Sequence, residues 1–68
     1  MNGIINLRLL EPGTTISLSD GSTAEVVSNP WDGVWVFARY LSSPIDASVV
    51  GTEEMIFAQN IVEILNTP

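Results

Sequence analysis

The most informative stretch of the chain is residues 33–41, where apolar side chains occupy nearly every position. In a strand, successive side chains point to opposite faces. One face of such a strand would carry Val34, Val36, Ala38 and Tyr40. The other face would carry Trp35, Phe37, Arg39 and Leu41. A half-solvated strand would have polar residues at every second position. The segment therefore predicts a central strand with a small core on one side and a second layer, or another copy of the chain, on the other.

Turn-forming residues divide the rest of the chain into short apolar segments. They occur at Pro12-Gly13, Asp20-Gly21, Asn29-Pro30, Asp32-Gly33, Pro44 and Gly51. Such dense and regular punctuation is typical of a small all-β fold. We expect strands at residues 14–18 and 23–28, joined by a two-residue hairpin turn at Asp20-Gly21. Residues 1–11 are expected to form an N-terminal strand or arm.

The last third of the chain, residues 52–65, fits two templates. As a helix it has Thr52 as its N-cap and two acidic residues in the first turn, where the helix dipole favours them. As strands it divides into residues 54–58 and 61–65 around a tight turn, with many β-branched side chains. We favour strands, because the apolar residues at 55–58 would surround a helix and the preceding meander needs partners. An α+β fold with a C-terminal helix at 52–65 is the alternative.

The order of these features resembles the small SH3-like β-barrel class. The matching features are Pro12-Gly13 before a strand, the Asp20-Gly21 hairpin, the long central strand and the closing sequence Phe57-Ala-Gln-Asn-Ile-Val-Glu-Ile-Leu65. That closing sequence is similar to the strand, one-turn 3₁₀ helix and last strand of the class. The resemblance covers residues 12–66 and implies one barrel domain, residues 1–68, of about five or six strands. It implies no single function, since the class has protein-binding, RNA-binding and enzymatic members.

The small size of the chain favours self-association. A domain of 68 residues buries only a small core, and natural domains of this size often add disulfides, a metal or oligomerisation. Cysteine and histidine are both absent, which excludes disulfides and removes the best zinc ligands. We therefore expect a homo-oligomer, and a dimer because two-fold symmetry is the commonest; a barrel that folds alone is the alternative. The expected interface residues are Val34, Trp35, Phe37, Arg39 and Leu41.

The charge of the chain disfavours polyanionic partners. Eight acidic residues stand against two arginines, giving a formal net charge of −6. This charge opposes the approach of phosphate backbones and anionic lipid headgroups, so we expect no nucleic acid and no membrane partner. No apolar run approaches the length of a membrane span, and the N-terminal segment does not have the pattern of a secretory signal. These features favour a cytoplasmic location.

Catalytic side chains are scarce in the sequence. There is no histidine, cysteine or lysine to act as a base, thiolate nucleophile or Schiff-base amine. Asp20 and Asp32 lie in turns, where aspartate is favoured for local hydrogen bonds, and no loop has the ligand spacing of a calcium motif. We therefore expect no enzymatic activity, no catalytic residues, no metal and no cofactor.

Two function hypotheses follow from the aromatic residues, because tryptophan is common both in cores and at binding hot spots. In the first, the chain is a small acidic interaction module that self-associates and contacts a protein partner through Trp31, Asp32 and the loop after Ser43. In the alternative, it is an oligomer whose inter-subunit cleft binds a small cationic molecule. Trp35, Tyr40 and carboxylates would line that cleft.

Overall fold

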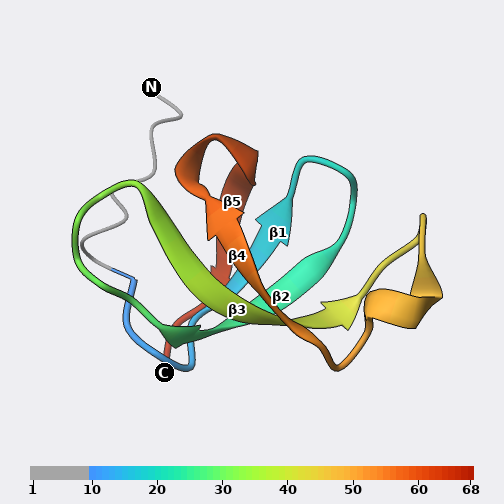
Figure 1. The fold of residues 1–68 in the computed structure, drawn as a ribbon, viewed down its shortest axis with the longest axis horizontal. Coiled ribbons are helices and arrows are strands. Elements are labelled where there is room, and N and C mark those ends of the chain that lie inside the picture. Colours follow the sequence, from blue (N-terminus) through green and yellow to red (C-terminus); the bar gives the residue numbers. More distant parts are fainter. Residues whose placement is uncertain (1–9) are drawn as a thin grey trace.

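The computed structural model describes residues 10–68, which form one antiparallel sheet of five strands (Figure 1). The strands are β1 (Thr15–Leu18), β2 (Thr23–Ser28), β3 (Trp35–Ser42), β4 (Glu53–Phe57) and β5 (Ile61–Asn66). They lie in the order β4-β3-β2-β1-β5. The 3₁₀ helix η2 (Ala47–Val49) precedes β4, and η3 (Ala58–Asn60) joins β4 to β5. Of the expected N-terminal strand or arm, residues 1–11, residues 1–9 lie outside the described residues, and Leu10 and Glu11 are not in a strand.

The C-terminal stretch forms strands, as predicted, and the alternative of a helix over residues 52–65 is wrong. Ile56 in β4 is 4% exposed, whereas its neighbours Met55 and Phe57 are 45% and 42% exposed. This alternation has the two-residue period of a strand. In a helix, residues two positions apart do not lie on the same face. The tight turn expected after β4 is the single turn of 3₁₀ helix η3.

The core lies on the inner, concave side of the sheet. Its buried apolar side chains are Leu10, Ile16, Leu18, Ala24, Val26, Val36, Ala38, Ile56 and Ile61. In β1, β2 and β3 they occupy alternate positions, so one face of each strand is buried. Leu10 joins them from the segment before β1. Its carbonyl oxygen accepts a hydrogen bond of 2.8 Å from Nδ2 of Asn29, which fixes this segment against the end of β2.

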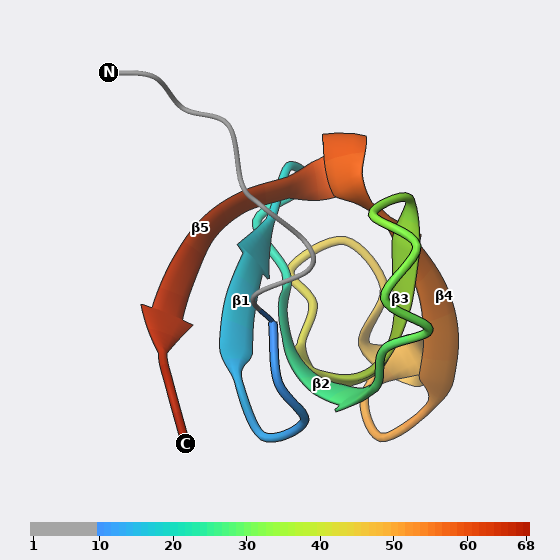
Figure 2. The ribbon, with the colours of Figure 1, turned by 90° about the vertical axis from the view of Figure 1, so that its left-hand side faces the viewer.

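The sheet is strongly curved, so that its inner face wraps around the core (Figure 2). Its edge strands, β4 and β5, are consecutive in the chain and are connected by η3. Among the described strands β4 and β5 are not paired with each other, and the sheet is therefore not closed by main-chain hydrogen bonds. Within residues 10–68, each of these strands has one edge without a paired strand.

The turn between β1 and β2 is longer than predicted. The N–H of Leu18 donates to the carbonyl of Ser22 at 2.8 Å, and the N–H of Gly21 donates to the carbonyl of Leu18 at 3.0 Å. Gly21 has a φ of +90°, as expected, but Asp20 does not have the positive φ that a two-residue type I′ turn requires. Asp20 instead accepts a hydrogen bond of 2.9 Å from the N–H of Ser22. This side-chain bond stabilises the longer loop.

Candidate functional site

The outer face of β3 is uncovered within the described chain. On the inner face Val36 and Ala38 are completely buried, whereas on the outer face Phe37 is 38% and Leu41 is 44% exposed. The predicted division of this strand into two faces is confirmed. Residues 10–68 supply no second layer over the outer face, which leaves large apolar side chains in water.

β4 extends this apolar surface across the neighbouring strand. Trp35 lies opposite Phe57, and Phe37 lies opposite Met55. The rings of Trp35 and Phe37 make an edge-to-face contact with centroids 4.8 Å apart, a geometry that aromatic pairs prefer. We call these four residues, Trp35, Phe37, Met55 and Phe57, the outer strip. Met55 and Phe57 were not predicted as site residues, because their position beside β3 follows from the strand register, which the sequence does not give.

An ion pair marks one end of the outer strip. Nη2 of Arg39 lies 2.7 Å from Oε2 of Glu53 on the opposing position of β4, and both side chains are nearly half exposed. Glu25 of β2 lies opposite Arg39 on its other side. An exposed pair of this kind contributes about 0–1 kcal/mol. The main consequence of this ion pair is for the local charge of the surface, because Arg39 is the one arginine or lysine side chain among residues 10–68.

The loop before β3 presents a second aromatic feature. Trp31 has a φ of +65°, in the left-handed region that non-glycine residues rarely adopt, and 48% of it is exposed. Two side chains hold the loop: Oδ1 of Asn29 accepts from the N–H of Trp31 at 2.8 Å, and Oδ1 of Asp32 accepts from the N–H of Val34 at 2.9 Å. The predicted turn role of Asp32 is confirmed by its bond to Val34. The loop therefore holds a large aromatic side chain partly in solvent.

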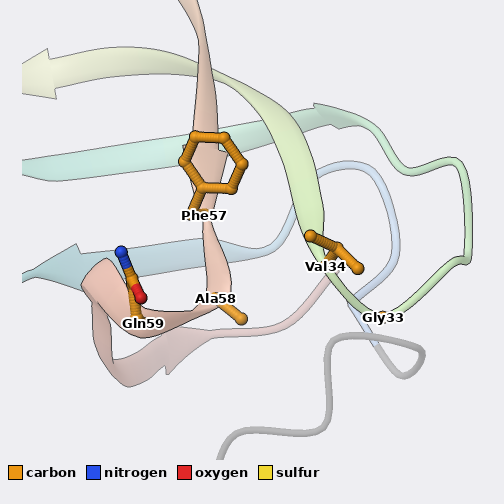
Figure 3. A pocket seen from close by; sticks show the side chains of 5 residues that line it. All are labelled: Gly33, Val34, Phe57, Ala58 and Gln59. Carbon is orange, nitrogen blue, oxygen red and sulfur yellow. The ribbon is translucent and has the colours of Figure 1, made fainter.

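A shallow hollow of about 390 Å³ lies between this loop and η3 (Figure 3). Its lining residues are Gly33, Val34, Phe57, Ala58 and Gln59. The two sides of the hollow are joined by a hydrogen bond of 2.9 Å from the N–H of Ala58 to the carbonyl of Val34. Phe57 belongs to both the hollow and the outer strip. The two features therefore form one continuous apolar surface.

The other predicted binding residue, Tyr40, lies away from Trp35. The two side chains are five positions apart on β3 and on opposite faces, a separation of about 17 Å along the strand. Tyr40 is partly buried against the core. Loss of solvation raises the pKa of its hydroxyl, and the negative charges of Asp20 and Glu54 raise it further. A single chain therefore does not bring Trp35 and Tyr40 into one cleft.

The loop after Ser43 is exposed. Ile45 is 72% and Val50 is 46% exposed, so Ile45 does not plug the end of the sheet. Oδ1 of Asp46 accepts a hydrogen bond of 3.0 Å from the N–H of Ser48 at the start of η2. The hydroxyl and the N–H of Ser48 together lower the pKa of the Asp46 carboxyl. In the β1–β2 turn, the N–H of Ser22 is the main cause of a lowered pKa of Asp20. Both carboxylates thus act as local turn and cap groups.

Neither a metal centre nor a membrane helix is present in the described part of the chain. Residues 10–68 bring no three potential histidine, cysteine, aspartate or glutamate ligands together. No helix among them is long and apolar enough to cross a membrane. Comparisons with protein-family models, curated proteins and solved structures find no match.

Proposed function

We propose that this chain is a small non-enzymatic interaction module that self-associates through the outer strip. The observation that carries the proposal is the pairing of four large apolar side chains across β3 and β4, of which Phe37, Met55 and Phe57 are exposed and Trp35 is partly buried in the described chain. Monomeric soluble proteins rarely expose a large contiguous apolar patch, and such patches often mark interaction sites. Arg39 and Leu41 extend the proposed interface along β3, and Val34 extends it into the hollow.

Charge also favours this surface. The chain carries a formal charge of −6, so two copies repel each other over most of their surfaces. The carboxylate of Glu53, at one end of the outer strip, is paired with Arg39 at 2.7 Å. The four side chains of the strip are uncharged, so repulsion between copies is smaller there than over the acidic parts of the surface.

The direct test of this surface is a pair of aspartate variants. Phe37→Asp puts a charge in the middle of the outer strip, whereas Ile45→Asp puts the same charge on an exposed loop residue outside it. We expect light scattering after size exclusion to report a monomer for Phe37→Asp and an oligomer for Ile45→Asp. Circular dichroism should give the same β-sheet spectrum for both variants. An unchanged oligomer in folded Phe37→Asp would exclude the strip as the interface.

The protein partner is proposed to contact Trp31, Asp32 and, at the opposite end of β3, the loop after Ser43 (Figure 1). Support comes from the half-exposed Trp31, which the Asn29 and Asp32 hydrogen bonds hold in a left-handed conformation. Strained backbone of this kind is concentrated at functional sites. Replacing Trp31 by alanine should abolish partner capture in a binding assay with purified partner, without changing the oligomeric state.

The second candidate function is small-molecule binding, and the hollow lined by Gly33, Val34, Phe57, Ala58 and Gln59 favours it. Its volume of about 390 Å³ is within the range of ligand pockets. The lining contains no carboxylate, so it suits an apolar group better than the cationic ligand expected from the sequence. Thermal-shift measurements against matched apolar and cationic compounds test this: saturable stabilisation supports ligand binding by mass action.

The SH3-like class is proposed for the fold on the strength of the strand order and of the single 3₁₀ turn between the last two strands.

For partners, the net charge of −6 argues against nucleic acid and anionic membranes. A cytoplasmic location is proposed because no apolar run in the sequence approaches the length of a membrane span and the N-terminal segment does not have the pattern of a secretory signal. Titration of labelled oligonucleotides should detect no binding at physiological salt.

A further inference from the structure

The two open edges of the sheet differ in regularity. β4 pairs with β3 through five consecutive residue pairs without a register shift. β5, at the other edge, pairs with β1 with shifts between Thr15 and Ile16 and between Ser17 and Leu18. Irregularities of this kind twist an edge and hinder pairing with another strand, whereas a regular edge is a template for it. β4 is therefore the edge that is better prepared to accept a further strand.

The main-chain groups of β4 that face this edge can be identified from the ladder. Hydrogen bonds from Ala58 to Val34 and from Tyr40 to Thr52 mark hydrogen-bonded positions at both ends of the β3–β4 pair. Because such positions alternate along an antiparallel pair, the N–H and C=O groups of Glu54 and Ile56 point toward β3. The groups of the intervening residues point to the open edge: Glu53, Met55 and Phe57.

We propose that β4 pairs with β4 of a second copy of this chain, antiparallel about a two-fold axis at Met55. The inference rests on the proposed self-association and adds to it a contact between the β4 edges, which lie beside the outer strip. This register is the one antiparallel register that pairs all five residues of β4 with each other. It joins the sheets of the two copies into one continuous sheet.

This register keeps identical carboxylates of β4 from facing each other directly. With Met55 on the axis, Glu53 lies opposite Phe57 of the second copy, and Glu54 lies opposite Ile56 of the second copy. A shift that centred the pairing on Glu54 would place two identical carboxylates opposite each other, which is destabilising. The order of residues in β4, with acidic side chains in its first half and apolar ones in its second, thus favours pairing about Met55 over pairing about Glu54.

The same register makes the outer strips of the two copies continuous. Phe37 and Met55 lie side by side in one copy, and Met55 then meets Met55 and Phe37 of the second copy in the same row. Trp35 and Phe57 lie in the adjacent row, which ends at the Arg39–Glu53 ion pair of the second copy. Edge pairing thus joins the two strips into one apolar surface flanked by ion pairs, and the outer face of this surface remains available for further contacts.

Cysteine cross-linking tests the register, because the chain has no cysteine of its own. In Met55→Cys the two thiols face each other across the axis, with Cα atoms about 5.5 Å apart, within disulfide range. In Glu53→Cys the equivalent thiols are about 13 Å apart along the strands. We expect mild oxidation to give covalent dimers of Met55→Cys about tenfold faster than of Glu53→Cys or of the loop control Ile45→Cys, because the paired thiols react as one bound unit.

A mixed experiment sharpens the result. Glu53→Cys mixed with Phe57→Cys should give the heterodimer in preference to either homodimer, because those two positions face each other. Light scattering of the reduced, unmodified chain tests self-association separately from the β4 pairing. A dimer in which Met55→Cys cross-links no faster than Ile45→Cys overturns the β4 pairing and leaves self-association standing. A monomer at every concentration overturns both.

Discussion

The two faces of β3 have similar apolar content and different environments. Val36 and Ala38 on the inner face are inaccessible to solvent, because the curved sheet closes around them. Phe37 on the outer face is 38% exposed, although it is larger and more apolar than alanine. Hydrophobicity thus determines which side chains need to be covered. The curvature of the single sheet determines which of them one short chain can cover.

The largest contrast is expected from the same charge placed on each face. Val36→Asp buries an unpaired carboxylate, which costs several kcal/mol, and a domain of this size has only about 3–5 kcal/mol of stability from its core. Circular dichroism should therefore report an unfolded chain. Phe37→Asp should remain folded and lose only its association. If Val36→Asp is folded and as stable as Phe37→Asp, the assignment of inner and outer faces is wrong.

A smaller contrast is expected on β4, where alanine replaces neighbouring residues. Ile56→Ala leaves a cavity in the core and should lower the free energy of unfolding by about 2–4 kcal/mol. Phe57→Ala removes a side chain that is 42% exposed, and should cost less than about 1 kcal/mol at dilutions where association does not contribute. Urea unfolding of both variants measures the difference, and equal losses would contradict the alternation.

The smallest effect is expected from acid, because the carboxylates with lowered pKa lie in turns and on neither face. The pKa values of Asp20 and Asp46 are lowered in the folded chain. Their contribution to stability is complete above the unfolded pKa of about 3.9 and is lost as the pH falls through the lower folded values. Thermal unfolding should therefore show a modest loss of stability below about pH 4, and the double variant Asp20→Asn and Asp46→Asn should lose less.

The strands and their inner faces were predictable because they are local properties. The alternation of Ile16 and Leu18, or of Val36 and Ala38, is visible in sequence and is confirmed by burial. The β1–β2 turn was predicted one step too short, because the hydrogen bond from Ser22 to Asp20 stabilises a longer loop that Asp-Gly alone does not indicate.

The candidate site was only half predictable. Trp35 and Phe37 were identified from their own strand, but Met55 and Phe57 reach them through a pairing that spans about twenty residues of chain. Trp35 and Tyr40 were predicted on opposite faces of β3 and lie there, so only a cleft between subunits could bring them together. Register and curvature are long-range properties, and a single sequence carries little information about either.

The chain is proposed to self-associate through the outer strip. Light scattering coupled to size exclusion, carried out on the unmodified chain over a range of micromolar concentrations, is the decisive measurement of this association. We expect a folded species of twice the chain mass that dissociates in the Phe37→Asp variant. A well-folded monomer at the highest soluble concentration would contradict it, and would leave the outer strip as a surface for a different partner.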